Sequence, residues 1–138
     1  MAKAELRQRL AAILAADAVG YSRLMARDER ATVGALDAAR RIFRSEIDSR
    51  GGRVIDTAGD SVLALFETAS GALAAAVAIQ QTLGAASQAV PEERRMRFRI
   101  GIHLGDVMEK RDRTVYGDGV NIAARLQALA EPGGITVS

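Results

Sequence analysis

An uninterrupted apolar run near the N-terminus, LAAILAA over residues 10–16, ends on an acid, Asp17. An extended segment that is apolar on both faces is typical of a strand in the middle of a sheet, so we expect a central strand over residues 10–17. The preceding basic residues and the small-x-small triplet Ala16-Asp17-Ala18 also fit a secretory signal peptide. The run is at the lower edge of the length that such peptides need, which favours the buried strand.

The rest of the chain alternates strand-like and helix-like patterns. The expected elements after the first strand are a helix from Asp28 to about Arg50, strands over residues 53–58 and 61–66 joined by a turn at Gly59-Asp60, a helix capped by Thr68 that extends to about Gly84, a strand over residues 96–107, a helix from about Gly119 to Ala130 capped by Asp118, and a strand over residues 135–138. Apolar residues at helical spacing mark the helices, and alternation marks the strands. This order predicts an α+β fold, an antiparallel-rich sheet with helices packed on one face.

Composition narrows the classes of function. The 138 residues include 19 basic and 17 acidic side chains, scattered along the chain with a net charge of +2, so no basic stripe indicates nucleic-acid binding. No later stretch is apolar for long enough to span a membrane, so we expect no membrane contact from this segment. The absence of cysteine excludes a disulfide framework and a thiolate metal site, and it fits a cytoplasmic protein or domain.

Two acidic residues, Asp17 and Asp60, are candidates for a metal-binding site. Asp17 ends the first predicted strand and Asp60 lies in the hairpin turn, so their carboxylates converge if the strands are neighbours. Carboxylate oxygens are ligands that Mg²⁺ prefers, and the ion keeps its other positions for water and substrate phosphates. Taken singly, Asp17 could be a helix N-cap and Asp60 a turn acid, but the two together favour a metal site.

Two further groups could bind a phosphorylated substrate. Val19, Gly20, Tyr21 and Ser22 directly follow Asp17, in a turn that opens a helix and offers backbone N–H groups to phosphates. In the last predicted helix, Asn121 and Arg125 are four positions apart and project from one face. A solvated helix face would show the same pair, so neither signal is specific on its own.

Four segments taken together are specific. LAADAVGYSRL, GGRVIDTAGDS, FRIGIHLGDV and VYGDGVNIAARLQALAEPGGITVS, in this order and spacing, resemble the class III nucleotidyl cyclase homology domain, the catalytic module of adenylyl and guanylyl cyclases. The resemblance covers residues 10–138 and implies a ferredoxin-like fold. The family's domain continues beyond the last of these segments, so we expect residues 1–138 to be a single cyclase domain truncated at its C-terminus.

The resemblance also implies a role for each candidate residue. Asp17 and Asp60 match the family's two metal-binding aspartates, and residues 18–22 match the loop that wraps the triphosphate. Asn121 and Arg125 match its ribose-orienting asparagine and its transition-state arginine. The implied cofactors are two Mg²⁺ or Mn²⁺ ions per site. The implied assembly is a head-to-tail homodimer in which one subunit binds the metals and the other contacts base, ribose and transition state.

The resemblance implies that the residues at positions 56 and 114, here Asp56 and Thr114, read the base of the nucleotide. Asp56 stands where adenine-reading cyclases usually carry lysine, and Thr114 stands at the second base-reading position. An ionised carboxylate only accepts hydrogen bonds, which suits the N–H donors of guanine better than N1 of adenine. Asp56 could instead turn away from the base, toward Arg53 or a basic residue of the partner subunit.

The family's usual activity sets the expected function. By family frequency, we expect an adenylate cyclase that converts ATP to 3′,5′-cyclic AMP and pyrophosphate for intracellular signalling. One alternative is a guanylyl cyclase that uses GTP, which the carboxylate at position 56 favours. The other is a degenerate cyclase-like domain that serves dimerisation or nucleotide sensing.

Overall fold

A long central strand organises the fold. The computed structural model of the chain describes residues 6–138, and in it strand β1 (Leu6–Ala18) lies between β3 (Ser61–Phe66) and β4 (Phe98–Lys110). It pairs antiparallel with both neighbours, and residues 11–16 are buried, as the apolar run predicts. The strand begins earlier than expected because β4 pairs with it along its whole length.

The sheet has the strand order β2-β3-β1-β4-β5, and β6 pairs parallel with β4. Strand β2 (Gly52–Asp56) forms the expected antiparallel hairpin with β3, and Gly59 takes a left-handed φ of 58° in the turn between them. Strand β6 (Ile135–Val137) agrees with the sequence pattern. Strand β5 (Val115–Tyr116) was not predicted, because two residues are too few to show an alternation.

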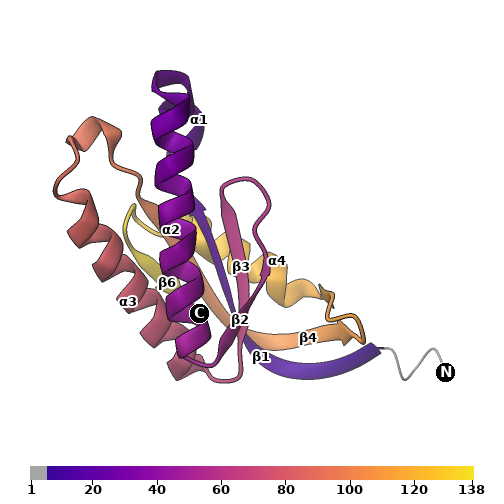
Figure 1. The fold of residues 1–138 in the computed structure, drawn as a ribbon. Coiled ribbons are helices and arrows are strands. Elements are labelled where there is room, and N and C mark those ends of the chain that lie inside the picture. Colours follow the sequence, from indigo (N-terminus) through magenta and orange to yellow (C-terminus); the bar gives the residue numbers. More distant parts are fainter. Residues whose placement is uncertain (1–5) are drawn as a thin grey trace.

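Two long helices cover one face of the sheet. Helix α2 (Glu29–Ser49) and helix α3 (Ala69–Ser87) pack on the face that contributes Phe66 and Phe98 to the larger hydrophobic core. In Figure 1, α2 runs in front of the sheet and α3 lies to its left. The expected cap of α3 is present, since the Thr68 side chain accepts a hydrogen bond from the Gly71 N–H. Among residues 6–138, no helix has both the length and the apolar character needed to cross a membrane.

The opposite face is covered by helix α4 (Asp118–Leu129), which lies behind the sheet in Figure 1. Its Ala123 packs with Ile13, Leu65 and Val107 in a second, smaller core. The α+β class and the antiparallel sheet are confirmed, but the helices divide between both faces instead of sharing one. The reason is that β1 is apolar on both sides, so each side needs a cover.

Three local details also differ from the sequence prediction. Asp118 does not cap α4: the N-cap is Gly117, which has a φ of 130° and makes no side-chain cap hydrogen bond. The short helix α1 (Tyr21–Arg27) begins in the turn that we expected to open a helix, but the sequence pattern set no bounds for it. The 3₁₀ turn η2 (Glu92–Arg94) lies in a segment for which no helix was predicted. Both are too short to show the repeating apolar spacing on which the prediction relied.

Helix α4 approaches β4 at Gly101. A Cβ atom added there would lie 2.2 Å from the backbone N of Gln127 and 2.5 Å from the backbone O of Ala123. Both atoms belong to the helix backbone, so no side-chain rotation could relieve the overlap. Glycine at this position therefore sets how closely α4 lies on the sheet.

The substitution Gly101→Ala is expected to lower the free energy of unfolding by about 1–3 kcal/mol, because α4 must move away from β4. The matched control is Gly84→Ala in α3, where an added Cβ has nothing within 4 Å. That change is expected to raise the free energy of unfolding by about 0.4–1 kcal/mol. Urea unfolding of both variants measures the difference, and an unchanged midpoint for Gly101→Ala would contradict the close approach.

Candidate functional site

The two acids predicted as metal ligands lie next to each other at one end of the central strands. Asp17 is the penultimate residue of β1 and is paired with Ser61 of β3, so the preceding residue, Asp60, lies beside it. Oδ2 of Asp60 accepts a hydrogen bond from the backbone N–H of Ala18 at 3.2 Å. The structure therefore brings the two carboxylates together, as neighbouring strands require.

Asp17 has an unfavourable electrostatic environment for its charge. Burial raises the pKa of its carboxyl, and the negative charge of Asp60 raises it further. The hydrogen bond from Gln127 and the positive charge of Arg99 lower the pKa, but the net shift is upward. Two adjacent carboxylates that repel each other are a donor set that suits a hard divalent cation, so Asp17 and Asp60 fit Mg²⁺ or Mn²⁺.

The turn that carries Asp60 is tied to helix α2 by Arg40. Nη2 of Arg40 donates a hydrogen bond to the carbonyl oxygen of Thr57 at 2.9 Å and another to that of Gly59. The sequence analysis missed this residue. The sequence could have indicated it, because Arg40 follows Leu36 by four positions. That spacing places a cation beside the apolar face of the helix, next to the sheet.

The two residues predicted to read the base, Asp56 and Thr114, line one pocket of about 360 Å³. The other residues that line it are Arg53, Val54, Ile55, Leu63, Asp112, Arg113 and Val115. Asp56 is exposed at the end of β2, and Thr114 precedes β5, so the pocket lies between the hairpin of β2 and the hairpin of β4 and β5.

Arg53 is engaged by a different acid. The partly buried Glu109 of β4 accepts a hydrogen bond from Nε of Arg9 at 2.9 Å and a second from Arg53. Burial raises the pKa of Glu109, but the Arg9 hydrogen bond and the charge of Arg53 outweigh it and the net pKa is lowered. Among residues 6–138 no ion pair joins Asp56 to Arg53. The interpretation that turned Asp56 toward Arg53 is not what the structure shows.

Asn121 and Arg125 lie apart from the acids of their own chain. Both are exposed on α4, whereas Gln127 of the same helix donates from Nε2 to Oδ1 of Asp17 at 2.6 Å. At about 100° per residue, Arg125 and Gln127 point about 200° apart around the helix axis. The structure therefore does not direct Arg125 toward Asp17 of the same chain.

The predicted phosphate-binding segment directly follows Asp17. Gly20 has a φ of 66° and forms the N-cap of α1, so the chain turns sharply after β1. Val19 is fixed by a backbone hydrogen bond to the carbonyl of Arg97, and Tyr21 packs against the larger core. Ser22 is exposed in the first turn of the helix.

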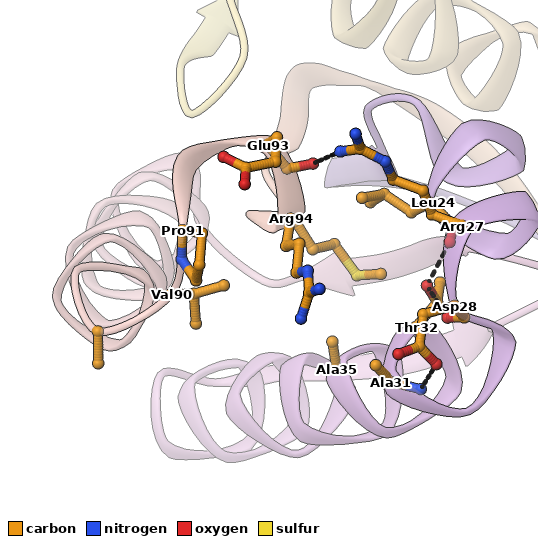
Figure 2. A pocket seen from close by; sticks show the side chains of 12 residues that line it. Leu24, Arg27, Asp28, Ala31, Thr32, Ala35, Val90, Pro91, Glu93 and Arg94 are labelled. Atoms are coloured by element: carbon orange, nitrogen blue, oxygen red, sulfur yellow. Dashed lines mark hydrogen bonds between the residues drawn. The ribbon is translucent and has the colours of Figure 1, made fainter.

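A separate hollow of about 450 Å³ lies between the α1–α2 corner and the segment before β4 (Figure 2). Arg27 reaches across it, and its Nη1 donates to the carbonyl oxygen of Glu93 at 3.4 Å. Leu24, Val90, Pro91 and Met96 supply apolar walls. None of the sequence-predicted site residues lines this hollow.

A family model described as "Adenylate and Guanylate cyclase catalytic domain" matches residues 5–138 of the chain. The chain is 49% identical over 139 residues to "Putative adenylate cyclase 3" of Rhizobium meliloti. This alignment covers 100% of this chain and 24% of that protein. It is 33% identical to an "Adenylate cyclase" of Streptomyces coelicolor, over 96% of this chain and 33% of that protein. The chain thus spans about a quarter to a third of the length of these relatives.

Solved structures show the same fold. The crystal structure of an adenylate/guanylate cyclase/hydrolase from Silicibacter pomeroyi aligns with a TM-score of 0.88 and 44% identity, over 96% of this chain and 77% of that chain. The adenylyl cyclase CyaB from P. aeruginosa aligns with a TM-score of 0.86 over 97% of this chain and 79% of that chain, at 21% identity. The second likeness concerns the fold alone.

The substitution Asp17→Asn is expected to raise the melting temperature of the metal-free protein at neutral pH. Because the pKa of Asp17 is raised in the folded chain, its ionised form disfavours folding. This loss of stability is absent at a pH below the pKa of Asp17 in the unfolded chain, because the acid is then protonated in both states. It is complete at a pH above the raised pKa of Asp17 in the folded chain, where the acid is ionised in both states. Asparagine removes the charge and keeps an oxygen that can accept from Gln127.

Thermal unfolding with a chelator and then with Mn²⁺ measures this effect. Mn²⁺ should raise the melting temperature of the wild type and leave that of Asp17→Asn nearly unchanged, because a cation held by the predicted carboxylate pair would bind only the folded chain. Asp37→Asn, an exposed change on α2, is the matched control and should behave as the wild type. A lower melting temperature for metal-free Asp17→Asn would contradict the proposed repulsion.

Proposed function

Because this chain belongs to the adenylate and guanylate cyclase catalytic domain family, we propose that it is a class III nucleotidyl cyclase that converts ATP to 3′,5′-cyclic AMP and pyrophosphate. The observation that carries this proposal is the juxtaposition of Asp17 and Asp60, which a catalytic cyclase site needs and which core packing does not explain. The relatives named as adenylate cyclases favour ATP as the substrate.

Asp17 and Asp60 would hold two Mg²⁺ or Mn²⁺ ions. When bound, such ions offset phosphate charge and make the ribose 3′-hydroxyl easier to deprotonate. Shortly after Asp17, residues 20–22 would place their backbone N–H groups against the triphosphate. The N–H of Val19 would not take part, because it is engaged by the carbonyl of Arg97. The left-handed conformation of Gly20 supports this role, because it turns the chain directly after β1 and starts helix α1 there.

Arg125 would stabilise the transition state. As the ribose 3′-oxygen attacks the α-phosphorus in line and pyrophosphate leaves, negative charge builds on the phosphate oxygens, and a fixed guanidinium offsets it. Asn121, one helical turn earlier on the same face, would orient the ribose. These roles need both side chains to be free at the surface of α4, and both are exposed there.

The direction of that helix face supports a head-to-tail homodimer. Arg125 points away from Asp17 of its own chain, so a complete site would combine Asp17 and Asp60 of one subunit with Asn121 and Arg125 of the other. Leu129, on the next turn of α4, is 75% exposed, which is unusual for a leucine unless another surface covers it. Two such sites would form per dimer, related by its two-fold axis.

GTP is the second candidate substrate, and the pocket between Asp56 and Thr114 is the observation that favours it. Asp56 is exposed in that pocket, and Arg53 is engaged by Glu109 instead. A free carboxylate would accept hydrogen bonds from guanine N1–H and N2–H₂, whereas it would face the acceptor N1 of adenine. Thr114 can donate or accept a hydrogen bond and so permits either base.

A complementation assay tests the proposed reaction and the shared site together. Asp17→Ala and Arg125→Ala are each expected to lose at least about a hundredfold in turnover, because each removes charge stabilisation from both sites. A mixture of the two should regain about a quarter of the wild-type activity, since about half of the dimers are mixed and each mixed dimer holds one intact site.

The matched control is a mixture of Asp17→Ala and Asp60→Ala, which should stay inactive because both sites of every dimer lack an acid. Cyclic nucleotide formation from ATP and from GTP with Mn²⁺ is the readout. A wild-type protein that turns over neither nucleotide would support the degenerate domain instead. Failure of the first mixture, with subunit exchange verified, would exclude the shared site.

The substitution Asp56→Lys should shift the ratio of kcat/KM values toward ATP by about ten- to a hundredfold. The reason is that lysine donates to adenine N1 where the carboxylate cannot, a difference of about 1.5–3 kcal/mol for one charged hydrogen bond. Asp48→Lys makes the same charge change at an exposed position of α2 and should leave the ratio unchanged. An unchanged ratio for Asp56→Lys would mean that Asp56 does not read the base.

A further inference from the structure

Helix α4 touches the acid pair through a single described hydrogen bond. Nε2 of Gln127 donates to Oδ1 of Asp17 at 2.6 Å, across 110 positions of sequence. The other groups around this acid are Arg99, which lies opposite it on β4, and Asp60, which is held by the Ala18 N–H. Gln127 is thus the one group from the α4 layer that is seen to hold the orientation of the Asp17 carboxylate.

The backbone that carries Gln127 has little freedom to move. An added Cβ at Gly101 would lie 2.2 Å from its backbone N, so the helix rests directly on β4 at this residue. Ala123, one turn earlier, is fully buried on the same side of the helix. A side-chain donor on such a rigid base can fix one carboxylate oxygen and leave the second available to a ligand.

We propose that Gln127 is a positioning residue for Asp17, so that α4 serves two catalytic sites at once. Through Gln127 it orients the metal-binding acid of its own chain, and through Arg125, about 200° around the helix, it reaches the site built on the partner's acids. This inference rests on the proposed function. It assigns to Gln127 a role in cis, while the neighbouring Arg125 acts in trans.

The competing interpretation is that Gln127 only anchors α4 to the sheet. In that case its loss would disturb Arg125 and Asn121, and Asp17 would be unaffected. The two interpretations differ in which chain of a mixed dimer must carry an intact Gln127. They also differ in whether metal binding changes before any nucleotide is present.

The first measurement is the affinity for Mn²⁺ in the absence of nucleotide. The electron paramagnetic resonance signal of free Mn²⁺ reports how much of the ion is bound. Gln127→Met keeps the length of the side chain and removes the donor, and is expected to weaken Mn²⁺ binding by about 10–100-fold. Gln127→Asn retains the amide but is too short to reach Asp17, and should show the same loss. Gln81→Met, on the exposed face of α3, is the matched control and should bind as the wild type does.

The second measurement places Gln127→Met in one chain of a complementing pair. In the mixture of Arg125→Ala/Gln127→Met with Asp17→Ala, the only complete acid pair lies on the chain that lacks Gln127, and the rescued activity should fall about 10–100-fold. In the mixture of Arg125→Ala with Asp17→Ala/Gln127→Met, that acid pair keeps its glutamine. Its rescue should match that of the parental mixture.

Each other outcome has a distinct meaning. Equal losses in the two mixtures, or a loss only in the second, would overturn the role in cis, and so would Mn²⁺ affinity that Gln127→Met leaves unchanged. Mn²⁺ binding that is insensitive to Asp17→Asn would overturn the proposed metal site and this inference with it. If the parental mixture shows no rescue, the shared site fails and the two-site role of α4 fails with it, and the Mn²⁺ affinities decide whether Gln127 positions Asp17.

Discussion

The fold depends on one strand that must be buried on both sides. Residues 11–16 of β1 carry no polar side chain, so one face requires the cover of α2 and α3 and the other requires α4. The penultimate residue of the same strand is Asp17, whose charge burial alone would disfavour. The strand thus places the carboxylate of Asp17 at the edge of the core. There Asp60 of the β2–β3 turn lies beside it, and Gln127 of α4 donates a hydrogen bond to it.

The elements that local patterns determine were predictable from the sequence. The hairpin of β2 and β3, the long helix after Asp28 and the cap at Thr68 follow from turn residues, apolar spacing and a hydroxyl at a helix start, all within a few positions. The acids at 17 and 60 followed in the same way, because neighbouring antiparallel strands place a strand end beside a turn. The roles proposed for these acids come from the family resemblance.

The contacts that sequence patterns missed are those between distant elements. Glu109 joins Arg9, 100 positions away, to Arg53, 56 positions away, and nothing in the local sequence names those partners. Likewise, an alanine-rich last helix does not reveal which face of the sheet it covers; that depends on the close approach at Gly101. Asp118 was mistaken for a cap because the left-handed conformation one residue earlier, at Gly117, leaves no local signal beyond the glycine itself.

The contact between Glu109 and Arg53 joins strands that are not neighbours, since β3 and β1 separate β4 from β2. Such a contact requires the sheet to bend, so this ion pair, with Arg9, helps to hold its curvature. The pocket of Asp56 and Thr114 lies on that bend, flanked by Arg53 and Arg113. The charges of Arg113 and Arg9 repel that of Arg53, and the carboxylate of Glu109 offsets this repulsion. The position of Arg53, which lines the pocket, therefore depends on a carboxylate, that of Glu109, which does not line it.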